Sequence, residues 1–163
     1  MQAPLTQRPA TLLGAVALIS IAAVAAALVS QHVFGMEPCP WCVLQRLIFV
    51  AIALACGLGL VWRAVAGRVV AALLVLGLSL SGVAAALWLH FVASKSESCN
   101  LTLADRVIVA LRLDTLMPEV FSPRANCAEA AVDLLGLPYT FWSLGLFALF
   151  AGVAVALLVR SRR

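Results

Sequence analysis

Charged residues are scarce in this sequence. Only 11% of its 163 residues are charged, whereas 64% are hydrophobic, and the mean hydropathy is +1.10. A soluble domain carries about a quarter charged residues, so this composition excludes an ordinary water-soluble protein. The basic residues are scattered along the chain rather than gathered in one segment, so the net charge of +4 does not indicate nucleic-acid binding.

Charge is nearly absent from four apolar stretches, which cover about residues 12–33, 43–62, 69–92 and 140–159. Each is roughly 20 residues long or slightly longer, enough for a helix to cross the hydrocarbon core of a bilayer. The stretches are continuously apolar rather than alternating, which indicates helices and not barrel strands. The first exceeds the about 7–15 apolar residues of a signal peptide, so we expect it to remain as a span. The sequence predicts one all-α membrane domain over residues 1–163, a four-helix transmembrane bundle.

The distribution of arginine predicts the orientation of the bundle. One side carries basic residues and no acid: Arg8, Arg63, Arg68, Arg160, Arg162 and Arg163. Every acidic residue falls in the two loops of the other side, at about residues 34–42 and 93–139. The positive-inside rule places both termini in the cytoplasm and these loops outside. Within the longer loop, the pattern of residues 101–113 predicts a short amphipathic helix on the outer membrane surface.

Four of the five cysteines fall on the predicted outer side. Cys39 and Cys42 form Cys-Pro-Trp-Cys at the start of the second span, and Cys99 and Cys127 enclose most of the long loop. Four cysteines in an oxidising compartment tend to pair, and they allow three connectivities, of which spacing favours Cys39–Cys42 with Cys99–Cys127. Cys56 lies in the middle of a span, where we expect a buried apolar residue.

The Cys-x-x-Cys pair is typical of redox-active sites, because a helix N-terminus favours the thiolate form of a cysteine. Pro40 suits the first helical turn, where its missing N–H removes no helical hydrogen bond. A thioredoxin-like domain would need a βαβ context, and c-type haem attachment would need histidine where Val43 stands. A structural zinc site is disfavoured at a lipid edge facing an oxidising compartment. Two purely structural disulfides remain the alternative.

Arg46 follows Cys42 by four residues, so both lie on one face of the predicted helix, about 6 Å apart along its axis. A charge at the edge of a span is costly and usually marks function. We interpret Arg46 as a fixed cation that stabilises a thiolate at Cys42 and an anionic reduced carrier beside it. The alternative is an arginine that extends to the interface. Gln45 is interpreted as an interfacial residue.

Several motifs together resemble the disulfide bond formation protein B (DsbB) family. They are Pro38-Cys39-Pro40-Trp41-Cys42-Val43-Leu44-Gln45-Arg46, Val120-Phe121, Asn126-Cys127-Ala128-Glu129, and Leu135-Gly136-Leu137-Pro138 with Trp142. The resemblance covers nearly the whole chain, including the number of spans and the loop lengths.

This resemblance implies a multi-pass protein of the bacterial inner membrane that reoxidises a periplasmic thioredoxin-like oxidase of DsbA type. The electrons taken from this oxidase would pass to ubiquinone, or to menaquinone. By analogy, the partner attacks Cys99, the released Cys127 exchanges with the Cys39–Cys42 pair at Cys39, and Cys42 donates to quinone beside Arg46. His90 is a further candidate for the quinone site, although a lone histidine there is equally consistent with an interfacial residue.

Two other functions compete with this interpretation. A vitamin K epoxide reductase-like protein also combines a four-helix bundle with Cys-x-x-Cys and a quinone, but its active pair sits elsewhere in the chain. A small transporter or channel subunit with structural disulfides would have ionisable groups deep in its spans. The sequence has none at mid-depth, which counts against it.

Overall fold

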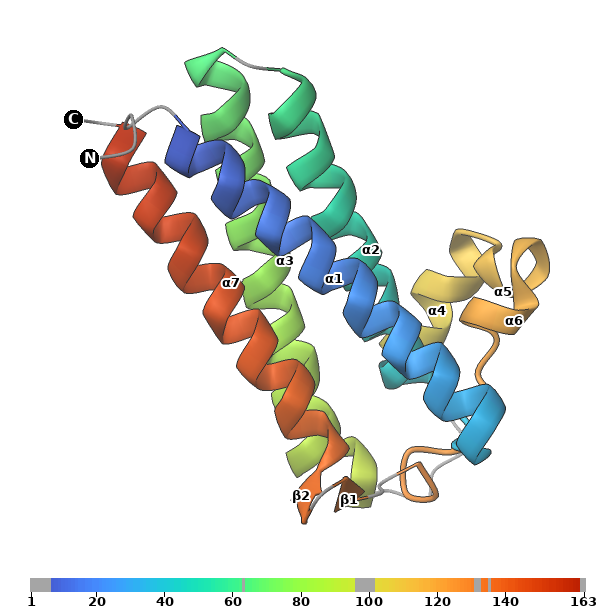
Figure 1. Ribbon diagram of the computed structural model, residues 1–163. Coiled ribbons are helices and arrows are strands. Elements are labelled where there is room, and N and C mark those ends of the chain that lie inside the picture. The colour runs from blue at the N-terminus through green and yellow to red at the C-terminus, as the bar shows by residue number, and fades with distance from the viewer. Residues whose placement is uncertain (1–6, 63, 96–101, 131–132, 135, 162–163) are drawn as a thin grey trace.

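Four long helices run side by side in the computed structural model (Figure 1). It describes residues 7–62, 64–95, 102–130, 133–134 and 136–161. The long helices are α1 (Gln7–Phe34), α2 (Pro40–Val61), α3 (Val65–Phe91) and α7 (Tyr139–Ser161). Each is long and apolar enough to cross a membrane, so the predicted four-helix membrane bundle is confirmed. Helices α1 and α7 extend beyond the predicted apolar stretches at both ends, whereas α2 and α3 begin earlier than predicted and end one residue earlier.

Helix α2 lies at the centre of the bundle. It packs against α1 on one side and α3 on the other, and α3 also packs along α7. Of the most apolar 18-residue stretch of each helix, 56% is buried in α2 but only 17% in α1. Helices α1 and α7 touch each other only slightly.

Aromatic side chains fill the middle of the bundle. Phe49 of α2 stacks on Phe147 of α7 with ring centroids 4.2 Å apart, and Phe150 meets Phe49 edge-on at 6.2 Å. Gly82 of α3 allows this close approach, since a Cβ atom there would lie 2.6 Å from the Phe147 ring. The middle of the bundle is therefore close-packed.

The connection between α3 and α7 lies at the end of the bundle where α2 begins, which we call the loop end (Figure 1). The described part of this connection consists of short elements: η1 (Ala93–Lys95), α4 (Leu103–Ala110), α5 (Leu113–Leu116), α6 (Pro118–Phe121), β1 (Asp133–Leu134) and β2 (Leu137–Pro138). The two strands form a hairpin in which Asp133 faces Pro138, and Gly136 makes its turn with a φ of +78°. This connection brings Cys127 back to the start of α2.

The predicted amphipathic helix corresponds to α4, which begins at a capping box formed by Thr102 and Asp105. Its buried residues, Ala104 and Ile108, face the bundle, and Ile108 packs with Val43 of α2. Leu103 is 63% exposed on the other side. Part of the apolar face therefore packs on protein instead of lipid, and contact of the remainder with the membrane surface stays a prediction.

Candidate functional site

The Cys-x-x-Cys pair forms the start of α2, as predicted. Cys39 is the N-cap residue, and its sulfur accepts a hydrogen bond from the backbone N–H of Cys42 at 3.3 Å. Pro40 occupies the first helical turn. The two Sγ atoms lie 2.7 Å apart as thiols. The backbone N–H of Cys42, one of the free N–H groups of the first helical turn, thus holds the Cys39 sulfur in place.

Cys127 lies against Cys39. The Cys39 thiol is hydrogen-bonded to Cys127, whose sulfur also accepts the backbone N–H of Trp41. Hydrogen bonds to Cys127 and Cys42, together with burial, raise the pKa of Cys39. The hydrogen bond from Cys39 lowers the pKa of Cys127, so the thiolate is favoured there. Cys39 is 0% exposed, and in the described part of the chain only Cys42 and Cys127 place sulfur against it.

Two sets of hydrogen bonds keep Cys127 at this position. The backbone N–H groups of Arg124 and Ala125 donate to the carbonyl of Pro38 at 3.0 and 3.3 Å. The Asn126 side chain accepts the N–H groups of Ala128 and Glu129 at 3.1 and 2.9 Å, which closes the turn that carries Cys127. This explains the asparagine of the Asn-Cys-Ala-Glu motif in physical terms.

Arg46 is buried at the loop end, where its guanidinium links α2 to α1 and α6. Nη1 donates to Gln31 Oε1 at 2.7 Å and to the carbonyl of Val120 at 3.1 Å, and Nη2 donates to the carbonyl of Ala27 at 3.3 Å. Gln31 Nε2 in turn donates to the carbonyl of Glu119 at 3.3 Å. At 6% exposure, Arg46 does not extend to solvent.

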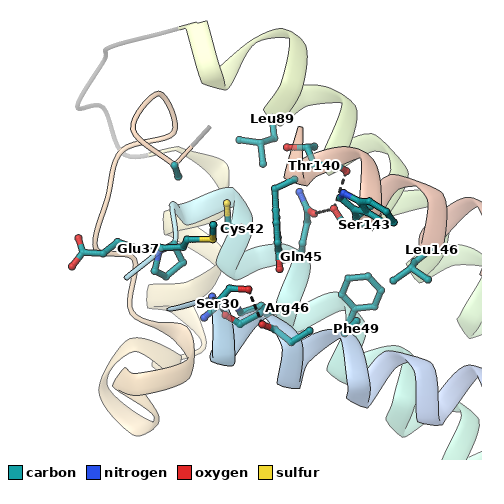
Figure 2. A pocket seen from close by; sticks show the side chains of 18 residues that line it. Ser30, Glu37, Cys42, Gln45, Arg46, Phe49, Leu89, Thr140, Ser143 and Leu146 are labelled. Atoms are coloured by element: carbon teal, nitrogen blue, oxygen red, sulfur yellow. Dashed lines mark hydrogen bonds between the residues drawn. The ribbon is translucent and has the colours of Figure 1, made fainter. Parts of the chain in front are cut away.

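A cavity of about 290 Å³ adjoins these residues, between α1 and α7 where the two helices barely meet (Figure 2). Cys42, Gln45, Arg46 and Phe49 line it from α2. Most of the remaining wall is apolar, and it is formed by Ala23, Ala26, Ala27, Met36, Pro38, Leu89, Ala130, Trp142 and Leu146 among others. The cavity has the size and the lining typical of a small-molecule site.

Gln45 differs from its prediction as an interfacial residue, because it is only 5% exposed. Its Oε1 lies 2.6 Å from the hydroxyl of Ser143 on α7 (Figure 2). Gln31 carried no signal in the sequence beyond being a polar residue near the end of a span. The helix packing that buries both glutamines could not be read from the sequence.

The other predicted residues do not line this cavity, or they lie outside the described residues. The His90 ring contacts Phe91 and Phe141 at 4.9 and 4.7 Å and lines a second cavity of about 140 Å³ beside Cys127. Cys56 is fully buried in the second half of α2. Cys99 lies outside the described residues.

Fold and site together define a multi-pass membrane protein with a buried Cys-x-x-Cys pair, a loop cysteine in contact with it, and a mainly apolar cavity. The family model for disulfide bond formation protein DsbB matches residues 9–157. Disulfide bond formation protein B 1 of Pseudomonas savastanoi pv. phaseolicola is 34% identical over 149 residues, covering 90% of this chain and 87% of the relative.

Other relatives agree. Disulfide bond formation protein B of Herminiimonas arsenicoxydans is 35% identical over 138 residues, which is 84% of this chain and 87% of the relative. Disulfide bond formation protein B 1 of Pseudomonas aeruginosa is 32% identical over 147 residues, which is 88% of this chain and 90% of the relative. The chain belongs to the DsbB family, and it is a redox protein of disulfide bond formation.

Proposed function

We propose that this protein reoxidises a periplasmic thioredoxin-like dithiol protein of DsbA type and passes the electrons to a membrane quinone. The single observation that carries the proposal is a continuous series of sulfur atoms. Cys127 touches Cys39, Cys39 touches Cys42, and Cys42 lines the cavity. Electrons entering at the loop therefore have a path of direct thiol–disulfide exchange to the cavity wall.

The exchange steps balance as follows. A thiolate of the reduced partner attacks Cys99 of a Cys99–Cys127 disulfide, which forms a mixed disulfide and releases Cys127 as thiolate. Cys127 then attacks Cys39 of a Cys39–Cys42 disulfide and releases Cys42. The partner's second thiolate resolves the mixed disulfide at Cys99. Cys99 then attacks Cys127, which restores the Cys99–Cys127 disulfide and releases Cys39. The Cys39–Cys42 dithiol would give two electrons and two protons to a quinone and re-form its disulfide. The partner loses two electrons and two protons in total.

The hydrogen bond from the backbone N–H of Trp41 to Cys127 supports this order. That donor belongs to the backbone of α2, so it remains when Cys39 is engaged in a disulfide. It partly offsets the burial and the Asp105 charge, which raise the pKa of Cys127, and so helps to form the attacking thiolate. Burial of Cys39 further restricts its exchange partners to the sulfurs already in contact with it.

The cavity residues fit a quinone head group. The volume of about 290 Å³ and the mainly apolar wall suit a flat ring. Arg46 supplies a cation, and the Gln45 Nε2 atom is a buried donor without a partner among the described residues. When bound, ubiquinone or menaquinone would accept two electrons and two protons, and Cys42 would face it beside Arg46. The cavity is lined by both α1 and α7, and a lipid-soluble carrier would enter it from the bilayer between these helices.

The orientation proposed is that of the bacterial inner membrane, with the loop end in the periplasm. Among the described basic residues, Arg68 and Arg160 lie at the opposite end from Cys39. This agrees with the positive-inside rule. The active cysteines then face the oxidising compartment in which a DsbA-type partner resides.

Quinone absorbance tests the proposal with purified protein, ubiquinone-1 and a reduced DsbA-type partner. Cys42→Ser and Cys99→Ser should each abolish quinone reduction, because each removes an obligatory sulfur. Cys56→Ser, which alters a cysteine remote from the others, should leave the rate unchanged. Full activity in Cys42→Ser would refute the proposal.

A further inference from the structure

Gln45 is an unusual residue for an apolar cavity wall. It lies on α2 between Cys42 and Arg46, both of which line the cavity with it. The side chain is buried, and burying an amide without full hydrogen bonding costs stability. Its Nε2 atom has no hydrogen-bond partner in the part of the chain that the structure describes.

The hydroxyl of Ser143 has two possible acceptors but only one proton. Its Oγ lies 2.6 Å from Gln45 Oε1 and 3.0 Å from the carbonyl of Thr140 (Figure 2). In one arrangement the hydroxyl donates to Gln45, and the amide NH₂ is left for a ligand in the cavity. In the other the hydroxyl donates to Thr140, the amide turns over, and Nε2 donates to Ser143 Oγ. Gln45 Oε1 is then left for the ligand.

These two arrangements need no movement of the backbone. The oxygen and nitrogen of an amide have nearly the same size, and a hydroxyl rotates to suit its neighbours. Gln45 therefore offers the cavity a donor or an acceptor, according to the direction of the Ser143 hydroxyl. An oxidised quinone oxygen only accepts hydrogen bonds, whereas the hydroxyl of the reduced carrier can also donate one.

We propose that Gln45 is a binding residue for both forms of the carrier, donating to the quinone oxygen and, after turning over with Ser143, accepting from the quinol hydroxyl. This rests on the proposed function, because it assumes that the cavity takes a quinone. The site then holds substrate and product through one side chain. Arg46 cannot do this, since a guanidinium donates but never accepts.

The test measures binding rather than turnover. The full-length protein in lipid nanodiscs is titrated without partner, first with ubiquinone-1 and then anaerobically with its quinol, and bound ligand is followed by tryptophan fluorescence. Gln45→Met keeps the length of the side chain and removes both hydrogen-bonding groups. We expect its affinity for each form to fall about tenfold. Unchanged affinity for either form overturns the proposal.

Ser143→Ala and Ser81→Ala form a matched pair. Ser81 on α3 donates to the carbonyl of Leu78, three residues back, at 2.7 Å, as Ser143 can to Thr140, but Ser81 is exposed and does not line the cavity. Ser143→Ala should lower the affinity for both the quinone and the quinol about threefold. Ser81→Ala should bind both forms with the affinity of the wild type. Equal behaviour of the two variants overturns the proposal, even where Gln45→Met fails to fold.

Infrared spectroscopy supplies a readout independent of affinity. The carbonyl stretch of ¹³C-labelled ubiquinone-1 should lie at lower frequency in the wild type than in Gln45→Met, because a hydrogen bond weakens the C=O bond. An identical frequency would overturn the donor role. If the wild type itself binds no quinone, the proposed function fails as a whole, whereas binding that ignores Gln45 removes only this inference.

Discussion

The middle of the bundle and its loop end are built in opposite ways. The middle is apolar and close-packed, with Phe49, Phe147 and Phe150 filling the space that Gly82 leaves open. At the loop end, Gln31, Gln45 and Arg46 are buried instead, beside a cavity. Close packing holds the helices together, whereas buried polar groups demand defined partners and so fix geometry. Substitutions in the middle should therefore affect stability, and those at the loop end should affect redox activity.

The largest effect is expected on stability, from Gly82→Ala. The added Cβ would lie 2.6 Å from the Phe147 ring, and such overpacking costs about 1–3 kcal/mol. Gly77→Ala on the same helix is the matched control, because a Cβ atom added there would meet no described atom within 4 Å. Thermal unfolding in detergent should show a lower midpoint for Gly82→Ala alone. Quinone reduction below that midpoint should stay near the wild-type rate, and a selective loss of activity would break the comparison.

Gln31→Leu should reduce partner-driven quinone reduction about tenfold. The substitution leaves an Arg46 donor without its acceptor, and an unsatisfied buried group costs about 1–3 kcal/mol. It also removes the hydrogen bond to the Glu119 carbonyl, so limited proteolysis around residues 113–124 should become faster. Val33→Ala, at a side chain that is 69% exposed, is the control and should change neither rate. A fully active Gln31→Leu would show that Arg46 needs no positioning by α1.

Asn126→Ala should have the smallest effect. We expect it to slow partner-driven quinone reduction about fivefold. It removes the side-chain oxygen that accepts the N–H groups of Ala128 and Glu129, and the loss of such a cap costs about 1 kcal/mol. Asn126→Asp keeps an acceptor and should restore most of the rate. Stopped-flow quinone reduction with a reduced partner measures both. If the aspartate variant is as slow as the alanine variant, the turn does not act through these hydrogen bonds.

The sequence was sufficient to predict the four spans, because lipid requires long apolar helices and leaves few alternatives. It also predicted the Cys39–Cys42 pair at a helix start, because local spacing and Pro40 determine that geometry. The contribution of Gln31 and the burial of Gln45 could not be predicted, since they depend on how α1 and α7 rotate against α2. The partial packing of α4 on α2 has the same origin: an apolar helix face does not specify whether it meets protein or lipid.

Contact between the two cysteine segments is the central claim, and a crosslink tests it most directly. In a Cys42→Ala/Cys99→Ala variant, Cys39 and Cys127 remain as neighbours without their proposed partners. Mild oxidation followed by non-reducing peptide mapping should find a Cys39–Cys127 disulfide in most molecules, with Cys56 still a thiol. Cys39 and Cys127 recovered separately as thiols would contradict the account.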